Sequence, residues 1–305
     1  MKLAVTGITS KTGSAFFENV VKNEAEFLEK WDGIRLFFRS NKPCNYVDDY
    51  RGSIRIERVI GDIESIPDLE KLMDGCDTVL HITKIQQSEK IMQAAINNGT
   101  KRIIAVHTTG MYSKYKEAGK EYKRIDDTVQ ELAEQNGIDL TIVRPTMIYG
   151  KMGDYNISRF IKLVDKFRFV PVVNGAKYYL QPVHYKDLGK AFYTILMNPE
   201  KTIGKQYNLS GENPIMLREM LEMIADDLGV KRGFINCPYP IAYTGACAIR
   251  AMTIGKVDVR EQVQRLCEDR AFSHEDATFD FGYQPRPFSE GLREEVEEYK
   301  HNSRR

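Results

Sequence analysis

The 305-residue sequence has few cysteines and no long apolar run. Its five cysteines are scattered and form no Cys-x-x-Cys pair, so neither a disulfide framework nor a zinc site is indicated. No apolar stretch reaches the ~18 residues that a membrane-spanning helix needs, and the apolar Leu3–Val5 is too short for a signal-peptide core. We therefore expect a cytoplasmic protein with reduced thiols, no metal and no membrane partner.

An excess of charge of one sign is also missing. The formal net charge is +1, from 44 Lys and Arg against 43 Asp and Glu, which excludes a global field that would attract nucleic acid. There is no internal repeat, low-complexity tract or linker rich in Pro, Gly or Ser. With 42% hydrophobic residues available for a core, we expect a globular protein whose partner is a small molecule and whose parts pack directly together.

Short apolar strands alternate with longer amphipathic segments through the first 145 residues. This is the pattern of βαβ units on a parallel sheet. The predicted fold class is α/β, a Rossmann-type doubly wound parallel sheet with a smaller α+β part. The predicted strands are Leu3–Thr6, Ile34–Arg39, Ile54–Ile60, Thr78–Ile82, Arg102–Thr108 and Leu140–Val143, and the predicted helices between them are Ser14–Lys30, Gln86–Asn98 and Glu121–Asn136.

The pattern becomes less regular beyond Pro145. We expect residues 1–150 with 183–200 to bind a nucleotide, residues 151–182 with 201–305 to select the substrate, and the site to lie in the cleft between them. The polar stretch Asn41–Gly52 is interpreted as a surface loop. The elements expected in this half are helices at Ser158–Phe167, Asp187–Met197, Leu217–Leu228 and Ser289–Lys300 and strands at Tyr178–Leu180 and Gln206–Leu209.

The turn Thr6–Gly13 joins the first strand to a helical pattern, the context that a dinucleotide-binding turn requires. Gly7 can take the tight turn, Gly13 permits close helix packing, and amides at the helix start would face a diphosphate. Ser10 stands where a glycine usually lets the backbone approach the ligand, and the alternative is an ordinary turn. The residues expected to contact the cofactor here are Gly7, Thr9, Ser10, Lys11, Thr12 and Gly13.

Arg39 ends the second strand, whose tip lies beside the adenosine ribose in this fold. An NAD site prefers an acid at this position, whereas a guanidinium suits the 2′-phosphate of NADP. We therefore predict NADP as the cofactor, with NAD as the alternative. A solvated arginine at a strand end is the other interpretation.

Further segments, in this order and spacing, resemble the extended or atypical short-chain dehydrogenase/reductase superfamily of NAD(P)-dependent epimerases, dehydratases and reductases. The resemblance spans nearly the whole chain and implies that Asp62 with Ile63 lies near the adenine, that Thr83 and Thr108 line the cofactor site, and that a homodimer can form. The segments are Gly61-Asp62, His81-Ile82-Thr83, Thr108–Tyr112, Arg144–Gly150, Pro182–Asp187 and Tyr207–Gly211.

The catalytic residues are where the sequence departs from these relatives, which use Tyr-x-x-x-Lys and a Ser or Thr at the end of the fifth strand. Thr108 matches the hydroxyl, and the family spacing puts the tyrosine at Tyr122 but Asp126 in place of the lysine. A lysine ammonium one turn away helps a tyrosine to lose its proton, and a carboxylate opposes this loss. Tyr122 is therefore expected to remain protonated.

Three arrangements could replace the function of the missing lysine. Lys123 is disfavoured because adjacent helical residues are rotated by about 100°. Tyr112 and Lys116 have the Tyr-x-x-x-Lys spacing, but they lie on the loop after the strand and not on the usual helix. In the third arrangement a protonated Tyr122 donates a proton or a hydrogen bond to a carbonyl. NADPH then supplies the hydride, and Thr108 or Thr109 assists.

Three functions stay open on the sequence. The first is an NADP-dependent oxidoreductase acting on a carbonyl or hydroxyl group of a small molecule, with sugar nucleotides among the candidates. The second is an NAD(P)-dependent nucleotide-sugar epimerase or dehydratase. The third is a non-catalytic NADP-binding regulatory or assembly protein, in which Tyr122 and Asp126 lie on an exposed helix face.

Overall fold

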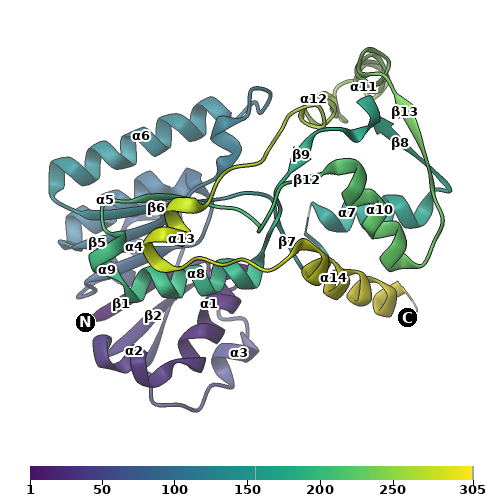
Figure 1. The fold of residues 1–305 in the computed structure, drawn as a ribbon. Coiled ribbons are helices and arrows are strands. Elements are labelled where there is room, and N and C mark those ends of the chain that lie inside the picture. Colours follow the sequence, from purple (N-terminus) through teal and green to yellow (C-terminus); the bar gives the residue numbers. More distant parts are fainter. Residues whose placement is uncertain (155, 304–305) are drawn as a thin grey trace.

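The computed structural model describes residues 1–154 and 156–303 and contains a seven-stranded parallel sheet of order β11-β6-β5-β4-β1-β2-β3 (Figure 1). The strand order reverses beside β1, which places a crevice at the carboxyl ends of β1 and β4. This order confirms the predicted Rossmann-type α/β class. The strands are β1 (Lys2–Thr6), β2 (Gly33–Phe38), β3 (Ile56–Ile60), β4 (Thr78–His81), β5 (Arg102–Val106), β6 (Asp139–Pro145) and β11 (Gln206–Leu209).

Helices cover both faces of this sheet because its strands are apolar on both sides. On β1, Leu3 and Val5 enter one hydrophobic core while Ala4 enters the other. The first core is covered by α1 (Lys11–Lys22), α2 (Glu24–Lys30) and α8 (Tyr185–Met197). The second is covered by α4 (Ile66–Met73), α5 (Ser88–Asn98) and α6 (Gly119–Asn136).

Several helices differ from the sequence prediction. The predicted helix Ser14–Lys30 is two helices, because the chain leaves helical geometry at Asn23 between α1 and α2. The segment Asn41–Gly52 is not loop throughout, since it contains the short helix α3 (Asn45–Asp48). Helix α4 was not predicted, because its eight residues are too few for periodicity to identify.

The second part has its own core, formed by α7 (Ile157–Lys166), α10 (Leu217–Leu228) and α14 (Phe288–Ser303). Outside the main sheet, the remaining strands form three two-stranded ladders. Residues 206–209 were expected with this part, but β11 pairs with β6 in the main sheet. The ladders pair β7 (Ile148–Tyr149) with β10 (Val183–His184), β8 (Phe169–Val173) with β13 (Gly233–Cys237), and β9 (Tyr179–Leu180) with β12 (Ile215–Met216).

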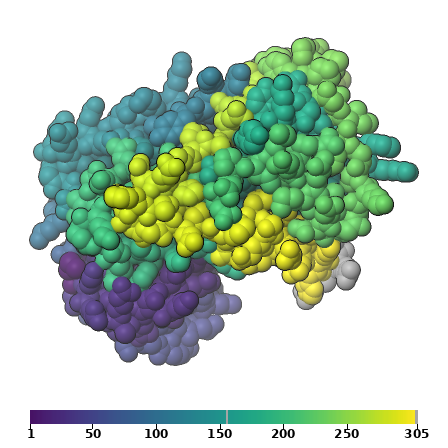
Figure 2. Space-filling view, viewed as in Figure 1, coloured from purple at the N-terminus to yellow at the C-terminus, as the bar shows by residue number. Residues whose placement is uncertain are grey.

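The chain crosses between the two parts near its C-terminus. After α11 (Tyr239–Met252) and α12 (Arg260–Arg265), residues 266–274 return to α13 (Glu275–Phe281), which packs on α9 (Pro199–Thr202) and β11 (Figure 1). The C-terminal residues therefore cover the junction of the two parts, as Figure 2 shows in yellow. Among the residues that the structure describes, no helix is long and apolar enough to cross a membrane.

Candidate functional site

The glycine turn after β1 is packed too closely for side chains. Gly7 has φ +76°, and a Cβ at this position would lie 2.8 Å from the carbonyl oxygen of Ile82 at the end of β4. A Cβ at Gly13 would lie 2.3 Å from the carbonyl oxygen of Gly7. Both positions therefore require glycine, and α1 abuts the turn as in a dinucleotide-binding site.

The N-terminus of α1 is open to an anion. The Ser10 hydroxyl caps the helix by accepting a 3.0 Å hydrogen bond from the Gly13 amide, and it lies 3.2 Å from the Thr12 hydroxyl. The amides of Lys11 and Thr12 have no acceptor within residues 1–154 and 156–303, and they combine with the positive end of the helix dipole. Thr9 belongs to the same turn. These groups fit the diphosphate of a dinucleotide.

Two side chains tie this turn to other segments. The Lys11 ammonium donates to the backbone carbonyls of Lys151 (2.6 Å) and Met152 (3.3 Å), which links the turn to the second part. The Tyr46 hydroxyl, from α3, donates a 2.7 Å hydrogen bond to the Ile8 carbonyl inside the turn. Tyr46 was not predicted from the sequence, although an aromatic residue within a polar segment was a usable signal.

Arg39 is exposed where β2 ends, at the same edge of the sheet as the turn. Arg58, on the neighbouring strand β3, stacks on the Phe38 ring at 3.9 Å and pairs with Asp48. Arg58 is thus committed to holding α3 against the sheet. Arg39 is not committed in this way, because no ion pair or hydrogen bond of its side chain is found among the described residues.

The remaining expected cofactor residues follow β3 and β4. Asp62 is exposed, and its carboxylate accepts a 3.0 Å hydrogen bond from the Glu64 amide, as a turn residue does. Ile63 is half-buried beside it. The Thr83 hydroxyl lies 3.2 Å from Nδ1 of His81 and its methyl group borders Gly7. These positions share one edge of the sheet.

Asp126, the residue in place of the lysine, lies in the protein interior. Its side chain is 1% exposed; Nδ1 of His107 donates to Oδ1 at 2.6 Å, and Arg144 donates to both oxygens at 3.0 and 2.5 Å. Burial raises the pKa of the carboxyl, but the hydrogen bonds from His107 and Arg144 outweigh burial and hold this pKa below its ordinary value. The interpretation that places Asp126 on an exposed helix face is therefore wrong.

The burial of Asp126 follows the period of α6. Ile125, Val129 and Ala133 are buried on the same helix face, so the apolar stripe of α6 passes through residue 126. Tyr122 is half-buried and packs against this core. Lys123 is exposed and pairs with Asp127, so it points away from Tyr122, as the helix geometry predicted.

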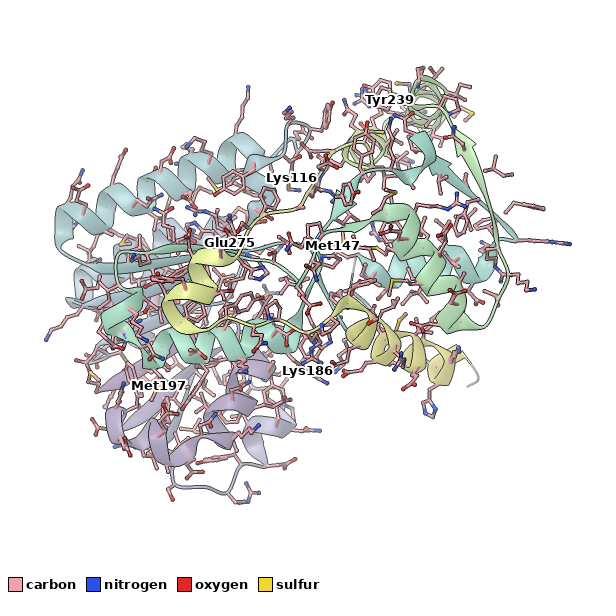
Figure 3. All side chains as sticks on the ribbon, viewed as in Figure 1. Lys116, Met147, Lys186, Met197, Tyr239 and Glu275 are labelled. Atoms are coloured by element: carbon pink, nitrogen blue, oxygen red, sulfur yellow. The ribbon has the colours of Figure 1, made fainter. Side chains whose placement is uncertain are left out.

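A cavity of about 210 Å³ lies where β5 and β6 end and the second part begins. Thr108, Thr109, Tyr112 and Lys116 line it from the Rossmann side, whereas neither Tyr122 nor Asp126 is among its described lining residues. Lys116 and Met147, both labelled in Figure 3, lie at this junction of the two parts. The loop pair Tyr112 and Lys116 therefore reaches the cavity, although its position in the sequence argued against it.

Thr108 and Lys116 are brought together by Gly110. The Thr108 hydroxyl accepts a 3.0 Å hydrogen bond from the Gly110 amide, which leaves its proton free for a ligand. A Cβ on Gly110 would lie 3.1 Å from Cδ of Lys116 and 3.2 Å from the Thr108 hydroxyl, so both side chains flank Gly110. The Lys116 ammonium lies 5.6 Å from the centre of the Tyr122 ring and 3.7 Å from the Glu261 carboxylate.

The sequence profile of a family described as NAD(P)H-binding matches residues 7–162, just over half of the chain. The chain belongs to this NAD(P)H-binding family. The family match includes the glycine turn, the Thr108 segment and α6. It supports the resemblance stated from the sequence.

Two curated relatives match parts of this NAD(P)H-binding protein. The mitochondrial NADH dehydrogenase [ubiquinone] 1 alpha subcomplex subunit 9 of Arabidopsis thaliana is 29% identical over 39% of this chain. N-acetyl-alpha-D-glucosaminyl-diphospho-ditrans,octacis-undecaprenol 4-epimerase of Escherichia coli O157:H7 is 20% identical over 61% of this chain. The alignments span only 29% and 65% of these relatives' own lengths.

Solved structures of the epimerase and dehydratase superfamily share the fold. The dTDP-glucose 4,6-dehydratase of Streptomyces venezuelae, solved with NAD and TYD, superposes with a TM-score of 0.74 at 18% identity, covering 99% of this chain and 98% of that chain. The UDP-glucuronic acid 4-epimerase of Bacillus cereus, solved with UDP-glucuronic acid and NAD, gives 0.73 at 15% identity, covering 99% and 100%. At these identities the likeness establishes the architecture alone.

Proposed function

We propose that the protein is an NADP-dependent oxidoreductase that interconverts a carbonyl and a hydroxyl group of a small molecule in the cavity beside Thr108. The observation that carries the proposal is a free threonine proton and a lysine ammonium in one cavity at the carboxyl edge of the sheet. In Rossmann-type folds ligands bind at this edge. We assign the cofactor to residues 1–150 with 183–200 and the substrate mainly to the second part.

The residues of the turn would hold the diphosphate through the α1 amides, and Arg39 would pair with a 2′-phosphate. Asp62 and Ile63 would border the adenine, and Thr83 would border the nicotinamide half. When bound, the nicotinamide supplies or accepts a hydride. The Thr108 hydroxyl would donate to the substrate oxygen, and the nearby Lys116 ammonium would favour negative charge developing there.

Two tyrosines can supply the proton in this proposal. Tyr122 has the family spacing, and its ring lies near the Lys116 ammonium. Tyr112 lines the cavity and stands four residues before Lys116. Tyr122→Phe and Tyr112→Phe separate the two, because only the residue that donates the proton should lower kcat by about 10²-fold or more.

The test is oxidation of NADPH by the purified protein with a panel of small carbonyl compounds. We expect turnover that falls by about 10²-fold in Thr108→Val and in Lys116→Met. Lys114→Met is the matched control, because Lys114 is exposed and outside the cavity lining. Equal activity in Lys116→Met and Lys114→Met would remove Lys116 from the proposal.

A second candidate is a protein that binds NADP without catalysing a reaction. It is favoured by Asp126, which occupies the position of the family's lysine and is committed to His107 and Arg144. Cofactor binding without oxidation of NADPH across the panel would support this candidate. Conversion between nucleotide sugars without net oxidation would support the epimerase alternative.

A further inference from the structure

Helix α11 is apolar on the side that faces solvent. Its sequence contains one charged residue, Arg250, and Ala246 is the one residue of this fully described helix that is buried. Tyr239 shares a hydrogen bond with Gln264, so the inner side of α11 rests on α12. A helix that is apolar all round is normally enclosed by protein or by lipid. The exposed stripe of α11 has helical spacing and consists of Ile241, Gly245, Ala248 and Met252, of which Met252 is 77% exposed.

The turn after α11 adds two apolar side chains that face solvent. Ile254 is 90% exposed and has φ +52°, a left-handed conformation that disfavours a β-branched residue. Hydrogen bonds fix this turn, since the Ile254 amide donates to the Ala251 carbonyl and the Val257 amide to the Thr253 hydroxyl, both at 3.1 Å. Val257 is also exposed. We call the stripe of α11 together with these two side chains the α11 surface.

Cations outnumber acids around the α11 surface. The whole chain has 44 Lys and Arg against 43 Asp and Glu, whereas residues 231–260 contain five cations and one acid, Asp258. Glu261, the next acid, is shared by Lys116 and Arg265, each 3.7 Å from its Oε1. It therefore does not neutralise the α11 surface. The five cations are Lys231, Arg232, Arg250, Lys256 and Arg260.

A shallow hollow at the C-terminal end of α11 joins apolar side chains to these cations. Ile254 and Ala251 line it together with Arg250 and Arg260. Asp258 is the carboxylate for both guanidinium groups, at 3.2 Å from Arg250 and 2.7 Å from Arg260, so one positive charge remains. A guanidinium next to an apolar side chain suits the phosphate of a lipid head group above its acyl chain.

We propose that the α11 surface binds a lipid bilayer that contains anionic lipids. With 14 residues α11 is ~21 Å long, shorter than the ~30 Å hydrocarbon core, so the helix would lie in the interface and not span it. Figures 1 and 2 show α11 at the outer end of the second part, away from the main sheet. The proposal replaces the expectation of no membrane partner, which rested on the net charge of the whole chain and on the lack of a spanning segment.

A second copy of the chain is the other partner that an exposed apolar surface could bind. In a symmetric dimer the same patch meets itself, so the cations of the two copies would face one another. Like charges brought together across an interface oppose association. The negative potential of anionic lipids, in contrast, attracts each Lys or Arg near the membrane. The charge of the α11 surface therefore favours the bilayer.

The test is co-sedimentation of the full chain with vesicles of phosphatidylcholine, prepared with or without phosphatidylglycerol. We expect binding to the anionic vesicles that weakens by roughly tenfold or more in Ile254→Glu and in Met252→Glu. Phe279→Glu is the matched control, because Phe279 is also 90% exposed but belongs to α13, which packs on β11. Binding that is unchanged in Ile254→Glu, or lost equally in Phe279→Glu, would overturn the proposal.

Charge variants test the anionic part of the proposal. Lys256→Gln should bind anionic vesicles about fivefold more weakly, whereas Lys120→Gln, which is exposed on α6, should bind like the wild type. Equal binding to vesicles with and without phosphatidylglycerol would overturn the anionic partner. A dimer in light scattering that Ile254→Glu dissociates, without vesicle binding by the wild type, would assign the surface to a second copy instead.

The proposal is independent of the proposed function. No residue of α11 is among the described lining residues of the cavity beside Thr108, and vesicle binding needs no turnover. Vesicle binding without oxidation of NADPH would keep the membrane surface and reject the oxidoreductase. Oxidation of NADPH by a protein that leaves anionic vesicles unbound would keep the oxidoreductase and reject the membrane surface.

Discussion

The two sides of the cavity treat buried charge in opposite ways. Behind the Rossmann wall, the Asp126 carboxylate is matched by Arg144 and His107 within hydrogen-bonding distance. On the wall of the second part, Arg265 lies 3.7 Å from the Glu261 carboxylate, whereas Arg270 forms no ion pair with the residues that the structure describes. A charge that is balanced inside the chain serves the fold, whereas an unbalanced charge that faces a cavity is available to a ligand.

Glu295 is a third case, a buried carboxylate that forms no ion pair with the residues that the structure describes. Its oxygens accept hydrogen bonds from the Gly150 amide (2.9 Å) and the Ser158 hydroxyl (2.7 Å). Burial, together with the nearby charge of Asp154, raises the pKa of Glu295 to about 7. Hydrogen bonds alone therefore do not hold the pKa of this carboxyl below its ordinary value, in contrast to Asp126.

The largest effect is expected from Asp126→Asn. The substitution leaves Arg144 buried without its counter-charge, which should reduce the free energy of unfolding by about 3–5 kcal/mol in urea denaturation. Asp127→Asn, on the exposed face of the same helix, is the control and should remain within about 0.5 kcal/mol. Similar values for both variants would mean that the Asp126 network does not stabilise the fold.

Glu295→Gln should remove a pH dependence of stability. Because the pKa in the folded state is about 7 against an ordinary 4.5, the native protein binds more protons between these values, and its stability falls as pH rises through this window. The loss is about 3 kcal/mol and is complete above pH ~8. Glu295→Gln should flatten the curve in denaturation between pH ~5 and ~8, whereas Glu297→Gln, which is exposed, should keep its slope.

Arg102→Met tests whether a buried arginine whose Nη atoms are hydrogen-bonded behaves unlike Arg270. The variant removes three hydrogen bonds at the end of α8, and we expect a loss of about 2 kcal/mol in the free energy of unfolding. The same measurement on Arg270→Met should have the opposite sign. Equal losses of unfolding free energy in the two variants would mean that both arginines stabilise the fold in the same way.

Arg39→Ala probes a cation that is exposed to solvent, so its effect should be the smallest. We expect NADPH to bind about tenfold more weakly, which corresponds to about 1.4 kcal/mol, with little change for NADH. Calorimetry with both cofactors measures the ratio. Equal weakening of NADH and NADPH would remove Arg39 from recognition of a 2′-phosphate and favour NAD as the cofactor.

Local patterns were sufficient for the main sheet and for the glycine turn. Buried parallel strands are apolar throughout and alternate with helices, so β1 and β4 to β6 could be predicted from short windows. The same windows could not identify α4, which is short, or the break at Asn23, which depends on how α1 and α2 pack. Tyr46 was missed because its partner, the Ile8 carbonyl, is distant in sequence.

The sequence by itself determined the Rossmann-type architecture, the glycine turn and the absence of the family's lysine, because each depends on neighbouring residues or on spacing along one element. Only the tertiary structure decided that Asp126 is buried against Arg144 and that Thr108, Lys116 and Arg270 line one cavity. Those contacts join residues from distant segments, and the free energy of a buried charge depends on every group folded around it.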